Sequence, residues 1–118
     1  MTTDQPLPHF RVLEAPLVSF DLGDGISGQH AILYHSADKR RLAGSFKESG
    51  TMHEVMPFDE FIYVVAGSTR VTVEGQEPVL VEAGACCYLR QGQQVTFEHS
   101  DDFQDVVVLI SDDQPIDL

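Results

Sequence analysis

The stretch PFDEFIYVVAG, residues 57–67, places an acidic pair directly before an apolar run that a glycine closes. The run Phe61–Val65 is aromatic and β-branched, which is typical of a strand that is buried on at least one face. Side chains alternate along a strand, so Glu60 shares a face with Ile62 and Val64. The opposite face would hold Phe61, Tyr63 and Val65. Glu60 is therefore either a functional acid that faces an apolar cavity or a solvated residue at the rim.

The rest of the chain repeats short extended segments between turns. Candidate strands cover residues 29–35, 40–47, 69–73, 78–81, 85–89, 95–98 and 105–110, and two shorter extended pieces lie between residues 11 and 22. Segment 69–73 is expected to form a hairpin with the opening strand, and Gly23–Gly25 is a strong turn signal. No segment shows the 3.6-residue apolar period of a helix. The pattern predicts an all-β protein, built as a closed barrel or a two-sheet sandwich with few or no helices.

The chain has the length of a single domain. Its 118 residues are enough for one core. Residues 1–9 hold two prolines and mostly polar side chains, and we expect them to form a flexible N-terminal arm before one domain at 10–118. The sequence shows neither a membrane-spanning apolar run nor a secretory signal, so a cytoplasmic location is expected.

The composition is strongly acidic. Seven Lys and Arg against nineteen Asp and Glu give a net charge of −12. Such a charge repels nucleic acid phosphates and anionic lipid surfaces, so we expect neither nucleic acid nor a membrane as a partner. The two cysteines, Cys86 and Cys87, are adjacent. Adjacent side chains of a strand point to opposite faces, so both thiols are expected to be reduced.

Two glycine-containing motifs run through residues 42–110. Glu60 and Gly67 match the end of the motif G-x5-H-x-H-x3,4-E-x6-G, and Gly84 and Gly92 hold the glycine positions of G-x5-P-x-G-x2-H-x3-N. These are the two motifs of the cupin superfamily, which the chain resembles. The resemblance implies a single cupin-type jelly-roll β-barrel.

Four segments sharpen the resemblance. They are GSF at 44–46, DEFIYVVAG at 59–67, VEAG at 81–84 and VTFEH at 95–99. Together they are most similar to the subgroup that contains ureidoglycine aminohydrolase-like and ethanolamine-utilisation cupins.

The resemblance also implies where a metal would bind. Cupins bring imidazole and carboxylate ligands to the barrel mouth to hold a divalent ion. The four ligand positions fall here on His53, Val55, Glu60 and Val95. Only His53 and Glu60 can ligate, whereas catalytic sites ordinarily use three protein ligands. The set is incomplete, and binding of Mn, Fe, Ni or Zn would need a rearranged set drawn from Glu54, Asp59, Gln94 or His99.

The same alignment suggests residues for an organic ligand. Glu60 is the expected polar anchor, and Phe46 and Phe97 stand where aromatic residues occur in the subgroup. Arg90 replaces the proline of the second motif, and His99 replaces its terminal asparagine. Each has a structural alternative, since buried phenylalanines more often pack the core and an arginine is rarely buried without a partner.

Two classes of function follow, and the sequence leaves it open whether the protein is an enzyme. The first is a small-molecule-binding cupin with a degenerate metal site and a ligand in the barrel pocket. The second is a metal-dependent cupin enzyme that acts on a small polar metabolite such as a ureide, an amino acid or a sugar derivative. A third possibility is a purely structural role as a dimer building block. In every case we expect a homodimer, with the outward face of the opening strand as a suitable interface.

Overall fold

The computed structural model describes residues 6–23 and 26–118, with Leu22, Gly23, Ile26 and Ser27 described by their backbone alone. The first five residues of the expected N-terminal arm, and two of the three residues of the turn expected at Gly23–Gly25, lie outside this range. No helix in the described part of the chain is long and apolar enough to cross a membrane.

Strands make up most of the described chain. In order they are β1 Val18–Gly23, β2 Ile26–His35, β3 Arg41–Glu48, β4 Gly50–Val55, β5 Asp59–Ala66, β6 Ser68–Val73, β7 Val79–Glu82, β8 Cys86–Leu89, β9 Gln94–His99 and β10 Gln104–Ile110. A short 3-10 turn, η1 Val12–Glu14, is the one helical element among the described residues. The predicted all-β fold with few or no helices is confirmed.

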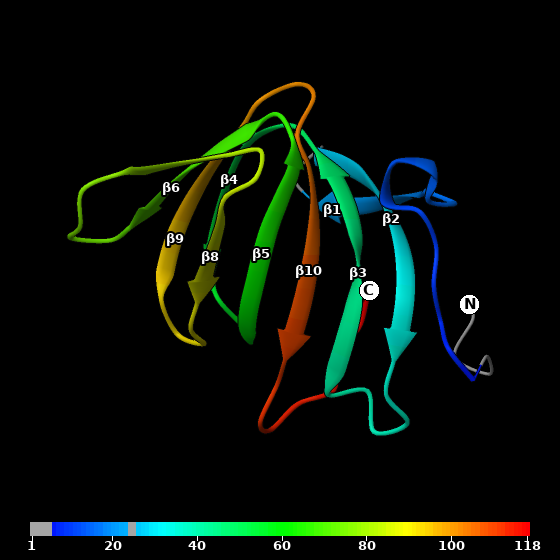
Figure 1. Cartoon of the computed structure of the whole chain (residues 1–118). Helices are drawn as coiled ribbons and strands as arrows, with labels where there is room; N and C mark the ends of the chain where they lie inside the picture. Colours follow the sequence, from blue (N-terminus) through cyan, green and yellow to red (C-terminus); the bar gives the residue numbers. More distant parts are fainter. Residues whose placement is uncertain (1–5, 24–25) are drawn as a thin grey trace.

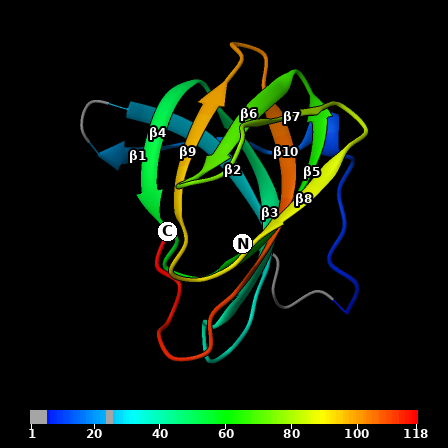
Figure 2. The same ribbon diagram turned by 90° about the vertical axis from the view of Figure 1, so that its left-hand side faces the viewer.

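The strands form two antiparallel sheets that face each other. The larger sheet has the order β1-β2-β3-β10-β5-β8, and the smaller has the order β4-β9-β6-β7. Figure 1 shows β3, β10, β5 and β8 side by side, and Figure 2 shows β4, β9 and β6 across from them. The core lies between the two sheets, as expected for a jelly roll.

The opening stretch forms the strand that its residue pattern predicts. In β5, Ile62 and Val64 are 2% and 0% exposed, whereas Phe61 and Tyr63 are 36% and 42% exposed. The inward residues belong to one core cluster with side chains from both sheets, among them Phe97 of β9. The predicted alternation is therefore confirmed, and it turns Glu60 toward the same interior.

Two local predictions were wrong, and one strand was missed. Strand β6 pairs with β7 and β9, not with β5, because the chain crosses between the sheets at Gly67. This residue has a φ of 68°, and a Cβ there would lie 2.8 Å from the backbone nitrogen of Phe103. Strand β4 was not predicted, since the segment GTMHEV lacks an apolar run. Residues 12–14 form the 3-10 turn instead of an extended piece.

Candidate functional site

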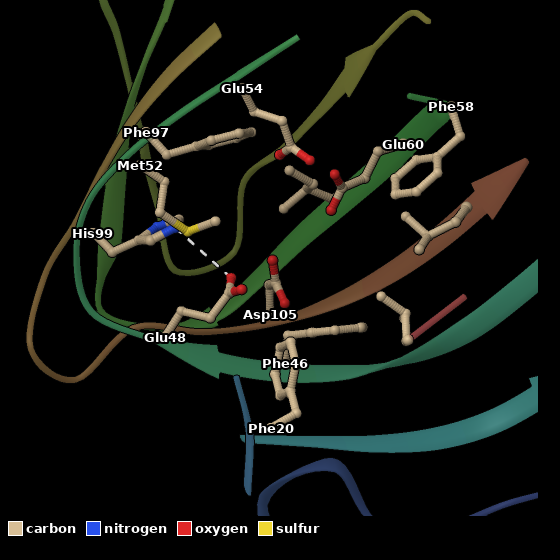
Figure 3. A pocket seen from close by; sticks show the side chains of 13 residues that line it. Phe20, Phe46, Glu48, Met52, Glu54, Phe58, Glu60, Phe97, His99 and Asp105 are labelled. Carbon is tan, nitrogen blue, oxygen red and sulfur yellow. Dashed lines mark ion pairs between the residues drawn. The ribbon is translucent and has the colours of Figure 1, made fainter. Parts of the chain in front are cut away.

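A cavity of about 90 Å³ lies between the two sheets. Its polar wall consists of four carboxyl groups and one imidazole, from Glu48, Glu54, Glu60, Asp105 and His99. Its apolar wall includes Phe20, Phe46, Met52, Phe58 and Phe97. Figure 3 shows the four carboxyl groups directed into the same space, with Phe97 and Met52 on one side and Phe46 and Phe20 on another.

Strand alternation explains why these side chains meet. In β3, Glu48 lies on the inward face with Leu42 and Phe46, and in β10, Asp105 lies on the inward face with Leu109. The polar groups stand on five different strands, β3, β4, β5, β9 and β10. The cavity therefore depends on the pairing of both sheets.

Glu60 interacts electrostatically with each of the other three acids, since the charges of Glu48 and Glu54 act on it and its own charge acts on Asp105. Burial, followed by the nearby charges of Glu48 and Glu54, raises its pKa to about 8. Both causes disfavour the ionised form, because a buried charge loses its hydration and a like charge repels it. At neutral pH the unliganded pocket therefore keeps a proton on Glu60.

The other three carboxyl groups are perturbed in the same direction. Burial, followed by the charge of Glu54, raises the pKa of Glu48 to about 7. Burial also raises the pKa of Glu54. Asp105 is 3% exposed, and burial raises its pKa well above the usual range, with further contributions from Glu60 and Glu48. The acids raise one another's pKa values, and the described residues of the pocket wall include no lysine or arginine.

Two buried polar atoms of the pocket residues have no hydrogen-bond partner. They are Oδ1 of Asp105 and Nδ1 of His99. An unsatisfied buried group costs roughly 1–3 kcal/mol. Such groups are uncommon in native structures, and a ligand that supplies the missing partner is one reason for them.

His99 is held by its aromatic neighbours. Its ring stacks on Phe103 at a centroid distance of 4.3 Å and on Phe97 at 5.5 Å. Its Nε2 lies 3.7 Å from Oε1 of Glu48, which is too long for a hydrogen bond. Burial lowers the pKa of His99 to about 4, so at neutral pH the imidazole is uncharged and this contact is not an ion pair.

The structure brings together most of the residues that the sequence proposed for a ligand site. Glu60, Phe46, Phe97 and His99 all line the cavity. Arg90 does not. It is exposed in the turn after β8, where its backbone N–H donates to Oε1 of Gln93 at 2.8 Å.

The residues proposed for a metal are not brought together. His53 is exposed on the outward face of β4, and its Nδ1 lies 3.0 Å from Oγ1 of Thr96. Its neighbour Glu54 points inward instead. Among residues 6–23 and 26–118, no group of three or more His, Cys, Asp or Glu side chains is placed to hold a metal ion. The site therefore does not fit the metal that the cupin resemblance implies.

Sequence reasoning missed Glu48 and Asp105 and treated Glu54 as a secondary alternative. A usable signal was present for the first two. Glu48 lies two residues after Phe46, and Asp105 lies two and four residues before Val107 and Leu109. A period of two places each acid on the face of these apolar residues. Glu54 was given only as an alternative because the motif spacing assigned the inward position to His53.

The two-sheet fold, together with a match to a cupin family model, defines the chain as a cupin. More narrowly, the chain belongs to the EutQ-like cupin family, whose domain matches residues 36–104. No curated protein is significantly similar to it. Among solved structures, a putative ethanolamine utilization protein Q from Salmonella typhimurium is similar at 20% identity and a TM-score of 0.67, covering 80% of this chain and 77% of that one.

Two further structures show the same fold. The EutQ protein of Clostridium difficile has 19% identity and a TM-score of 0.67, and the match covers 80% of this chain and 77% of that one. KdgF from a Halomonas species has 20% identity and a TM-score of 0.60, with 81% and 90% covered. At this level of identity the similarity establishes the shared fold.

Proposed function

We propose that the chain is a small-molecule-binding cupin domain that holds its ligand in the cavity between the two sheets. The observation that supports this most is Asp105, which is 3% exposed, lines the cavity and has a carboxyl oxygen without a partner. A polar group buried in this way is costly unless something binds it. We also propose that the metal site of the cupin fold is degenerate in this chain, so that the ligand is bound without a complete set of metal ligands.

The shape of the site supports binding. Binding pockets are mostly apolar with a few convergent polar groups, and here phenylalanine rings surround the four carboxyl groups. A cytoplasmic location belongs to the same proposal. The free thiols of Cys86 and Cys87 are consistent with it.

A thermal-shift screen of small metabolites, with cations, anions and neutral compounds all represented, tests the proposal. We expect at least one compound to raise the Tm of the wild-type protein by 2 °C or more, since a ligand stabilises the state that binds it. The same compound should have little effect on Glu60→Gln. Glu82→Gln, an exposed acid on β7, makes the same charge change outside the pocket and should respond as the wild type does.

The proposal fails if no compound of any charge raises the Tm. It also fails if the compounds that do so act equally on Glu60→Gln, because they would then bind elsewhere.

A further inference from the structure

We propose that the ligand of this pocket is a small primary ammonium ion, a protonated amine of about four non-hydrogen atoms, with its N–H groups on the pocket carboxylates and its alkyl part against the phenylalanine rings. The inference rests on the proposed function and names the chemical class of its ligand.

The polar wall selects for positive charge. Its four carboxyl groups come from Glu48, Glu54, Glu60 and Asp105, and the described residues that line the cavity include no lysine, arginine, amide or hydroxyl side chain. An anionic ligand would meet only acids and the uncharged His99. A bound cation stabilises the ionised form of these acids, so its binding would displace the proton that the unliganded pocket keeps on Glu60.

The unpartnered oxygen of Asp105 is a hydrogen-bond acceptor once the carboxyl group is ionised, and a cation beside it favours that form. Oδ1 of Asp105 is buried and accepts no hydrogen bond from the protein, and Figure 3 shows the Asp105 carboxyl group directed toward the same space as those of Glu48 and Glu60. A primary ammonium carries three N–H donors on one nitrogen. A quaternary ammonium carries none, so it would leave this oxygen unsatisfied.

The number of ligating side chains that meet at one point favours an organic cation over a metal ion. A metal requires several ligand atoms within about 2.0–2.6 Å of one point, and no group of three or more ligating side chains in the described residues meets that requirement. An ammonium nitrogen reaches carboxylate oxygens at about 2.7–2.9 Å, and its hydrogens point in different directions. It can therefore be held by fewer acids than the three protein ligands that a metal site ordinarily uses.

The size and lining of the cavity set the rest of the ligand. A cavity of about 150 Å³ holds benzene, so the 90 Å³ found here fits roughly four non-hydrogen atoms. The rings of Phe46, Phe58 and Phe97 offer apolar contact for an alkyl chain and attract a cation by their π faces.

Three compounds of similar size and different charge test this inference. They are propylammonium chloride, 1-propanol and sodium propionate, each titrated to 50 mM into the full chain at constant ionic strength, with binding followed by amide chemical shifts in NMR. We expect saturable shifts at Glu60 and Asp105 with propylammonium, at least tenfold weaker binding of propanol, and no binding of propionate.

A charge-matched pair of variants separates the pocket from the general attraction of a protein with a net charge of −12. Glu54→Gln with Glu60→Gln should weaken propylammonium binding at least tenfold. Glu77→Gln with Glu82→Gln makes the same change at exposed positions outside the pocket and should leave the affinity within a factor of two.

The outcomes distinguish the two proposals. If propanol or propionate binds in the pocket as well as propylammonium does, the ammonium inference is overturned and the binding function stands. Saturable binding of MnCl₂ at the same amides, without binding of propylammonium, overturns the inference in favour of an inorganic cation. The absence of any saturable shift with propylammonium at 50 mM also overturns it, whereas the binding function is judged by the screen above.

Discussion

Oε1 of Glu48 lies 3.7 Å from Nε2 of His99, yet the two groups do not form an ion pair at neutral pH, because desolvation keeps the imidazole uncharged. The pKa of His99 is lowered to about 4 by burial, against 6.5 for an unperturbed histidine. Below about pH 6.5, His99 binds a proton in the unfolded chain but stays unprotonated in the folded chain. The free energy of unfolding therefore falls as the pH decreases from 6.5 toward 4.

The first prediction is therefore that His99 stays neutral down to about pH 5 in the folded protein. Imidazole chemical shifts measured by NMR between pH 4 and 8 check this, and exposed His53 in the same sample provides a comparison. An inflection of His99 near or above pH 6.5 would show that Glu48 holds it protonated, contrary to this expectation.

The second prediction concerns Glu60, whose pKa rises from 4.5 to about 8 through burial and through the charges of Glu48 and Glu54. Because the folded pKa is the higher one, stability from this group is fully present below about pH 4.5 and is lost as the pH rises toward 8. Glu60→Gln should flatten that loss. One pKa unit corresponds to about 1.4 kcal/mol. At pH 8 the free energy of unfolding of Glu60→Gln should therefore be higher than that of the wild type by more than ~1 kcal/mol.

Urea unfolding at pH 5, 6.5 and 8 measures this effect. Glu82→Gln serves as the control, since the exposed acid should leave the pH dependence unchanged. Equal pH dependence of the free energy of unfolding in Glu60→Gln and the wild type would mean that Glu60 is ionised in the folded protein.

A third prediction concerns metal content. Protein purified without chelator should contain Mn, Fe, Ni and Zn well below one ion per chain, and EDTA should leave its Tm unchanged, because the pocket does not present a ligand set. Elemental analysis of the purified protein measures this. A near-stoichiometric ion that disappears in Glu60→Gln would instead favour the metal-dependent enzyme.

The fourth prediction is the homodimer. The outer face of the larger sheet exposes Phe61, Tyr63, Tyr88, Val108 and Ile110, and Phe61 pairs across the strands with both Tyr88 and Val108. We expect a second copy to cover this face, since monomers rarely expose large contiguous apolar patches. Light scattering should give twice the 13.1 kDa of one chain.

Phe61→Glu tests the interface and should yield monomers. Val55→Glu is its control, because Val55 is also exposed but lies on β4 of the other sheet. A wild-type protein that is monomeric at micromolar concentration would contradict the prediction.

The fifth prediction concerns the crossing between the sheets. Gly67→Ala should destabilise the fold by more than about 2 kcal/mol, because it adds a steric clash with the Phe103 backbone to the strain of a positive φ. Gly75 also has a positive φ, of 82°, but has open space around it, so Gly75→Ala should cost only about 1 kcal/mol. Chemical denaturation of both variants compares the two costs, and equal costs would show that the crossing tolerates a side chain.

The sequence predicted the strands that carry apolar runs. It did not predict correctly which strands pair in space. The run at Phe61–Val65 fixed the faces of β5, and period-two alternation extends to Phe46 and Phe97. Strand β4 is polar apart from Met52 and Val55, so it gave no comparable signal. The partner of β6 was wrong because only the crowding around Gly67 shows that the chain changes sheets there.

The prediction of the candidate site was wrong by one residue in the register of β4. Motif spacing placed His53 inward, but in β4 it is Glu54 that faces the cavity, and a shift of one residue reverses every side chain of a strand. The four acids come from segments far apart in the sequence. Their common orientation therefore required the strand pairing, which composition and spacing do not determine.

The division of the polar wall between the sheets has a mechanical consequence. Glu54 and His99 belong to the smaller sheet, whereas Glu48, Glu60 and Asp105 belong to the larger one. A cation that contacts acids of both would tie the sheets together as a non-covalent crosslink. Motions that separate the two sheets would then require release of the cation. Binding of the cation would therefore slow amide hydrogen exchange throughout β4 and β9, including residues that do not contact it.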